Sequence, residues 1–207
     1  MKIKNRLHQL IAAGALVAAS ASGSATTINF DGTGAPCCFV DSAPLRNLYS
    51  GVGVTFNGAG GNGGTILNQS GGFGFNALSG TDFLAFNLDL GSGNKQEIVF
   101  DTSVSNVSIW AANRFSGVTS MSAYSINGAL LSQASITNSS QWQVLAITSG
   151  TTGISKVVLE GSGRAYAYDD LEFTVSAVPE PETYALMLAG LGLLGVVSRG
   201  RKATAGN

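Results

Sequence analysis

Apolar and polar residues alternate through much of the chain between residues 26 and 178, which is the pattern of strands with one buried face. In one such segment Val107, Ile109 and Ala111 share a face, and Trp110 lies on the other. No stretch of this region has the spacing of a long amphipathic helix. Alternating segments start near Ile28, Val52, Leu84, Val107, Trp142 and Leu171. We therefore predict about ten strands in an all-β fold, a two-sheet antiparallel β-sandwich of the jelly-roll kind.

Two glycine-containing regions punctuate these segments. The dipeptide Asn127-Gly128 separates Ser122–Ile126 from Ala129–Gln133, and both of its residues tolerate positive φ, so a two-residue hairpin turn is predicted. The region from Asn57 to Gly74 is dense in glycine and predicts a flexible loop or an irregular pair of strands. A nucleotide-binding loop is not indicated, because no Lys-Ser/Thr pair follows the glycines.

The first 25 residues have the three parts of a secretory signal peptide. Three basic residues lie within the first six positions, an apolar run extends from Leu10 to Ala19, and small residues follow from Ser20 to Ala25. We predict an N-terminal signal helix that is cleaved after Ala25, with cleavage after Ala21 as a close alternative. An uncleaved membrane anchor is the other interpretation.

The C-terminal region also has three parts in a fixed order. Pro179, Glu180 and Pro181 form a rigid acidic box, and an apolar run of 14 residues extends from Tyr184 to Val197. As a helix this run would span about 21 Å, less than the roughly 30 Å of a hydrocarbon core. A basic cluster follows, made of Arg199, Arg201 and Lys202. By the positive-inside rule this cluster stays on the cytoplasmic side, so the run would stop transfer across the inner membrane.

The box, the short apolar helix and the arginine cluster together resemble the PEP-CTERM sorting signal, which some family naming also labels an ice-binding protein C-terminal domain. The resemblance implies export by the Sec machinery of a Gram-negative bacterium, at least transient anchoring in the inner membrane, and recognition by an exosortase that cuts near the box. The protein would then reach the cell surface or the extracellular matrix. An ordinary single-span anchor is the alternative. The implied organisation is 1–25 signal peptide, 26–178 β-sandwich, 179–202 sorting segment and 203–207 disordered tail.

Composition excludes several classes of function. Between residues 26 and 178 there are five Lys/Arg and ten Asp/Glu, a balance that disfavours nucleic-acid binding. The one histidine, His8, lies in the predicted signal peptide. The mature protein would therefore contain no His-based catalytic triad and no His-ligated metal. We predict no catalytic residues.

The last predicted strand carries two adjacent carboxylates, Asp169 and Asp170. The segment around them resembles the closing strand of exported jelly-roll modules, including carbohydrate-binding ones. That resemblance implies a structural Ca²⁺ held by Asp31, Asp169 and Asp170, since Ca²⁺ prefers oxygen ligands. The alternative is that these carboxylates cap a turn and face solvent.

The two cysteines, Cys37 and Cys38, are adjacent in the sequence. In an oxidising compartment we expect an oxidised form, and a strained vicinal disulfide, intermolecular bridges and free thiols all stay open.

These features favour a non-catalytic exported surface or matrix protein whose body binds exopolysaccharide. The runner-up is a secreted carbohydrate-active hydrolase with the same tail. Five aromatic residues are candidates for sugar stacking, although aromatic side chains more often pack in a core or in cross-strand pairs. They are Trp110, Tyr124, Trp142, Tyr166 and Tyr168.

Overall fold

A computed structural model describes nine stretches of the chain: residues 23–35, 37, 45–58, 63–74, 76–85, 95–150, 152–161, 166–175 and 187–192. The chain separates into two compact units. One unit runs from Gly23 to Ala177, and the other combines Met1–Ser22 with Val178–Asn207.

Within the second unit, residues 187–192 are helical, which agrees with the helix predicted for this apolar run. Among the described residues, no helix has both the length and the apolar character needed to cross a membrane. The predicted signal helix and the tail 203–207 lie outside the described residues, as do the remaining parts of the sorting segment: Pro179, Glu180, Pro181, Arg199, Arg201 and Lys202.

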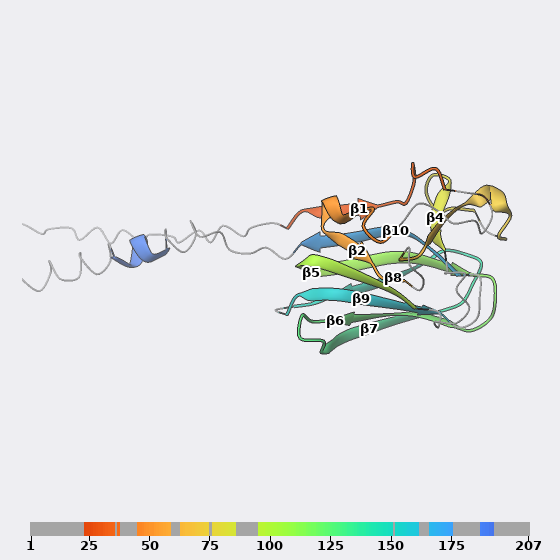
Figure 1. The fold of residues 1–207 in the computed structure, drawn as a ribbon. Helices are drawn as coiled ribbons and strands as arrows, with labels where there is room; N and C mark the ends of the chain where they lie inside the picture. Colours follow the sequence, from red (N-terminus) through yellow and green to blue (C-terminus); the bar gives the residue numbers. More distant parts are fainter. Residues whose placement is uncertain are drawn as a thin grey trace, which may run out of the picture. The chain divides into compact units, whose positions relative to one another are not determined.

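The first unit is built of antiparallel strands (Figure 1), which confirms the predicted fold class. The elements are β1 (Ala25–Ile28), η1 (Ser50–Val52), β2 (Val54–Phe56), β3 (Thr65–Asn68), η2 (Gln69–Gly71), β4 (Asp82–Ala85), β5 (Lys95–Asn113), β6 (Val118–Tyr124), β7 (Leu130–Thr137), β8 (Gln143–Thr148), β9 (Ile154–Gly161) and β10 (Tyr166–Val175).

The long strand β5 belongs to both halves of the fold. Its N-terminal part pairs with β2 on one side and β9 on the other, and β9 continues through β6 to β7. Its C-terminal part pairs with β10 and β8, and β10 also pairs with β1 and β4. The register with β9 shifts between Val99 and Val104, where the change of partner occurs. Hydrogen bonds therefore connect all ten described strands into one sheet, in which β1, β2 and β8 lie off the path β3-β4-β10-β5-β9-β6-β7.

The core lies between the two halves. Along β5 the residues Val107, Ile109 and Ala111, which were predicted to share a face, are almost fully buried. Phe100, from the N-terminal part of β5, packs on Phe173 of β10 with ring centroids 5.2 Å apart. The two halves thus contact each other through large apolar side chains, whose burial is the main source of stability for a fold of this kind.

The hairpin between β6 and β7 confirms the prediction around Asn127-Gly128, but its turn differs from the two-residue form. Gly128 N donates to Ser125 O over 2.9 Å, and Ser125 N donates to Ala129 O over 2.9 Å. Gly128 has φ 77°, whereas Asn127 has no positive φ. This is a β-turn followed by a left-handed glycine, the common three-residue hairpin loop. This loop needs only one residue with positive φ, because the bulge at Gly128 gives the hairpin the right-handed twist that a two-residue turn reaches with two such residues.

Replacing Gly128 with alanine should destabilise the protein by about 1 kcal/mol, because a residue with a Cβ atom is sterically strained in the left-handed backbone conformation. The space around its Cβ position is open, so no clash adds to this cost. Gly150→Ala is the matched control, since Gly150 also has open space and no positive φ. Urea unfolding measures both; equal stabilities of the two variants would contradict this description of the turn.

Candidate functional site

A groove of about 500 Å³ lies over β5, β9 and β6, on the side of this layer that faces away from the core. Its lining combines charged, polar and aromatic side chains. The residues are Asn57, Gly58, Lys95, Glu97, Tyr124, Gly128, Lys156 and Val158.

Strand alternation places these side chains on one face. In β5, Gln96 and Ile98 are buried. Lys95 and Glu97 alternate with them along the strand and therefore point outward. In β9, Lys156 and Val158 are the corresponding outward residues, and Glu97 lies directly opposite Val158. Tyr124 of β6 lies opposite Lys156. The groove therefore follows from the register of three strands, two of which are far apart in the sequence.

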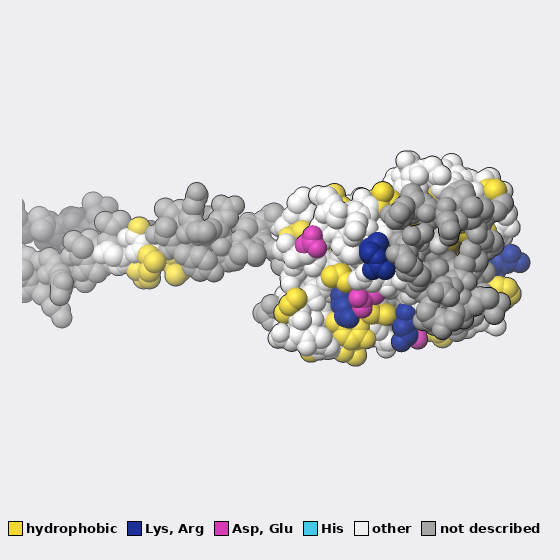
Figure 2. Space-filling model, viewed as in Figure 1, with side chains coloured by type: hydrophobic (Ala, Val, Ile, Leu, Met, Phe, Trp, Pro, Cys, Tyr) yellow, Lys and Arg dark blue, Asp and Glu magenta, His cyan; other side chains and the backbone are white. Residues whose placement is uncertain are grey.

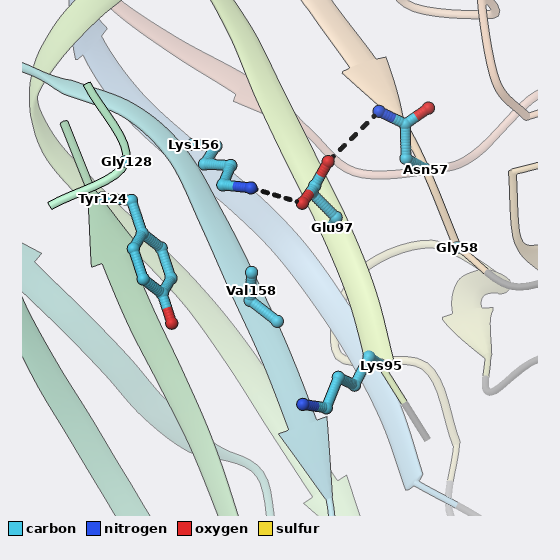
Figure 3. Close-up of a pocket in the computed structure, with 8 residues that line it drawn as sticks. All are labelled: Asn57, Gly58, Lys95, Glu97, Tyr124, Gly128, Lys156 and Val158. Atoms are coloured by element: carbon cyan, nitrogen blue, oxygen red, sulfur yellow. Dashed lines mark hydrogen bonds and ion pairs between the residues drawn. The ribbon is translucent and has the colours of Figure 1, made fainter. Parts of the chain in front are cut away.

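A polar network crosses the groove (Figure 3). Lys156 Nζ forms an ion pair with Glu97 Oε2 at 2.8 Å, and Asn57 Nδ2 donates to Glu97 Oε1 over 3.4 Å. Arg46 donates to the side-chain oxygen of Asn57. The Lys156 ammonium also lies 5.5 Å from the centroid of the Tyr124 ring, within cation–π range. These contacts hold the polar side chains in fixed positions on the groove floor.

A second ion pair lies beside the first and is more open to water. Lys95 Nζ is 3.4 Å from Glu160 Oε2, and the two side chains are 58% and 54% exposed. The corresponding values for Lys156 and Glu97 are 35% and 31%. The space-filling view shows Lys/Arg and Asp/Glu side chains beside one another on one face of the molecule (Figure 2). The groove thus has one well-held ion pair and one loose pair.

Hydrogen-bonding groups beside an aromatic ring suit a ligand with many hydroxyls and apolar C–H faces. Sequence reasoning singled out Tyr124 but missed Lys95, Glu97 and Lys156. The one local signal for them is a charged residue in an otherwise apolar strand, and their grouping depends on strand register.

The other aromatic candidates lie elsewhere. Tyr166 and Tyr168 are buried in the core, which agrees with the interpretation that aromatic side chains more often pack in a core than stack on sugars. Trp142 donates its Nε1–H to Asn76 O over 2.9 Å and packs against the smaller apolar cluster. Trp110 lies opposite Val144, on the other layer. Among the five candidates, Tyr124 alone lines the groove.

The three predicted calcium ligands converge on one loop. Asp31 Oδ1 accepts hydrogen bonds from Thr81 N over 2.8 Å and Asp82 N over 3.0 Å. Asp169 Oδ2 accepts from Leu78 N over 2.8 Å and from Ser79 N over 3.3 Å. These carboxylates therefore fix the backbone of residues 78–82.

A bulge in β10 brings Asp170 to the same loop. The register with β5 shifts between Asp169 and Glu172, and Asp170 has φ 45°. In a regular strand neighbouring side chains point to opposite faces, but the bulge turns Asp170 so that its Oδ1 accepts from Ser79 Oγ over 2.6 Å. Asp169 is fully buried, so it does not face solvent as the alternative interpretation expected.

Burial raises the pKa of Asp169 to about 7. Hydrogen bonds from the backbone N–H groups of Asp170, Ser79 and Leu78 oppose this rise, and the neighbouring Asp170 carboxylate adds to it. Asp169 thus differs from an ordinary surface carboxylate, because its protonation changes near neutral pH.

No group of three or more His, Cys, Asp or Glu within the described ranges is arranged to hold a metal ion. Calcium binding by Asp31, Asp169 and Asp170 stays a prediction. The loop hydrogen bonds already account for the position of these acids.

Cys37 is in a disulfide bond. Cys38 lies outside the described residues, so its pairing stays a prediction.

Comparison with solved structures finds β-rich domains of low identity. The K2 cleaved adhesin domain of Lys-gingipain is 13% identical, covers 73% of this chain and 100% of its own, and has a TM-score of 0.48. The CBM22-1 xylan-binding domain of Paenibacillus barcinonensis Xyn10C is 15% identical, with coverages of 77% and 100% and a TM-score of 0.44. TmCBM61, solved with β-1,4-galactotriose, is 18% identical, with coverages of 65% and 95% and a TM-score of 0.38. No curated protein matches.

A family model described as the PEP-CTERM protein-sorting motif matches residues 177–202. The matched range contains the Pro-Glu-Pro box, the apolar run and the basic cluster in the predicted order. The motif implies export and a cell-surface or extracellular fate. This chain therefore carries a PEP-CTERM protein-sorting motif at residues 177–202.

Proposed function

We propose that the protein is an exported surface or matrix protein whose β-sandwich binds polysaccharide in the groove over β5, β9 and β6. The observation that carries this proposal is the lining: the ring of Tyr124 lies beside the fixed polar groups of Asn57, Glu97 and Lys156. A sugar offers C–H faces to such a ring and hydroxyls to such groups. The volume of about 500 Å³ is within the usual range for ligand sites.

The sorting motif supports a route by which the protein would reach the cell surface or the extracellular matrix. The Sec machinery would export the chain, the apolar run would hold it in the inner membrane of a Gram-negative bacterium, and an exosortase would cut near Pro179-Glu180-Pro181. The protein would then be placed where exopolysaccharide is made. Binding that polymer would retain the protein in the matrix without further chemistry.

The proposed role is non-catalytic. A glycosidase needs two carboxyl groups that face each other across the scissile bond, one of them as a proton donor. Glu97, which lines the groove, and Glu160 beside it each form an ion pair with a lysine. This arrangement suits binding better than proton transfer, and it disfavours the alternative of a secreted hydrolase.

A glycan array probed with the purified exported protein, followed by a hydrolysis assay on every glycan that binds, tests the proposal. We expect binding of polysaccharides without release of shorter products. Hydrolysis of a bound glycan would show that the protein is a hydrolase and not a non-catalytic binding protein. If no glycan on the array binds, both proposed functions are wrong.

Intact-mass measurement of the protein recovered from its native host tests the processing at both ends. We expect a chain that starts at Thr26 and ends close to the Pro-Glu-Pro box. Cleavage after Ala25 would remove the first residue of β1, whereas cleavage after Ala21 would leave that strand complete. A mass that includes the basic cluster would show that the tail is retained as an ordinary anchor.

A further inference from the structure

The groove collects positive charge from an otherwise acidic body. Among the described residues of the body, the cationic side chains are Arg46, Lys95, Arg114 and Lys156. Lys95 and Lys156 line the groove, and Arg46 bonds to Asn57, which also lines it. Three cations thus lie in or beside the groove, and Glu97 is the one acidic residue of its lining, whereas acids outnumber cations two to one over residues 26–178.

The loose ion pair makes one of these cations available. An exposed Lys–Glu pair contributes little in water, because both side chains are solvated and screened. Lys95 and Glu160 are each more than half exposed, and their closest atoms are 3.4 Å apart. A carboxylate on a ligand can therefore replace Glu160 as the partner of Lys95 at little cost.

The tight ion pair has a different role. Lys156 is held by Glu97 at 2.8 Å and lies over the ring of Tyr124. Glu97 also receives the Asn57 amide, so each of its oxygens has one partner within the protein and can still accept a ligand hydroxyl. The inner part of the groove thus presents fixed polar groups beside an aromatic ring, and Lys95 stands at its more exposed part.

From these contacts we infer that the groove prefers acidic polysaccharides, whose sugars carry carboxylates, and that Lys95 binds the carboxylate in place of Glu160. This inference rests on the proposed function and adds the chemical class of its ligand. Lys95 is the residue that determines the preference for acidic sugars, and Glu160 is the internal competitor of the ligand.

Binding of the full exported chain to polygalacturonate and to its fully methyl-esterified, uncharged form tests this inference. The two polymers have the same backbone and differ in charge. We expect tighter binding of the acidic form, a loss of roughly fivefold in affinity for it in Lys95→Gln, and weakening by added sodium chloride. Glu160→Gln should act in the opposite direction and tighten binding of the acidic form. Arg114→Gln is the control, because Arg114 contacts Phe73 and Phe115 outside the groove.

Equal binding of the two polymers, or an affinity for the acidic form that Lys95→Gln does not change, overturns the preference for acidic sugars while the groove remains a glycan site. Failure of both polymers to bind also overturns it. If no glycan on the array binds either, the proposed function of polysaccharide binding is wrong as well.

Discussion

Replacing Asp169 with alanine should lower the free energy of unfolding by about 2–3 kcal/mol. Asp169 is fully buried and accepts hydrogen bonds from the backbone N–H groups of Leu78, Ser79 and Asp170. The alanine variant leaves these donors without their acceptor, and of the hydrogen bonds described between β10 and residues 78–79 only that from Ser79 Oγ to Asp170 remains. Urea unfolding measures the loss. The control is Asp101→Ala, which removes an exposed carboxylate from β5 and should change stability little. A loss no larger than that of the control would contradict this role.

The free energy of unfolding should also depend on pH through the Asp169 carboxyl group. The pKa of Asp169 is about 7 in the folded protein, against an ordinary value of 3.8. The folded state therefore binds this proton more tightly than the unfolded state. Its contribution makes stability fall as pH rises from about 4 to about 7, and it is constant above that range. Asp169→Asn cannot titrate, so the stability of the wild type relative to this variant should be lower at about pH 8 than at about pH 5. A difference that does not change with pH would contradict the raised pKa.

Replacing Tyr124 with alanine should weaken binding of the polysaccharide identified on the array by roughly tenfold or more. The ring supplies the aromatic surface of the groove, and its removal also takes away the cation–π partner of Lys156. Titration calorimetry measures the affinity, and circular dichroism checks that the variant is folded. Phe115→Ala is the matched control, because Phe115 is 50% exposed and does not line the groove. Equal affinities for the Tyr124 variant and the wild type would move the binding site elsewhere.

Much of the fold follows from local pattern. Alternation is a property of neighbouring residues, so the face shared by Val107, Ile109 and Ala111 could be predicted directly, and in the structure it is buried. The sorting tail could be recognised for a similar reason, since its three parts follow one another within residues 177–202. The hairpin at Asn127-Gly128 was also predictable, although its turn type depends on which residue takes the left-handed backbone.

The site could not be predicted in the same way, because it depends on pairing between distant strands. Lys95 meets Glu160 only through the register of β5 with β9, and nothing local indicates that register. The bulge that turns Asp170 toward Ser79 likewise breaks the alternation on which the sequence argument relied. The length of β5 adds to the difficulty, because one continuous strand serves both halves of the fold.

Hydrogen–deuterium exchange of the exported protein, with and without a saturating polysaccharide, is the most direct test of the central claim that the groove binds glycan. Binding should slow amide exchange in the segments that carry the groove residues, around Lys95–Glu97, Tyr124–Gly128 and Lys156–Val158. Amides of β10 near Asp169 should be unaffected. Protection confined to other parts of the sandwich, with no change in these three segments, would contradict the account.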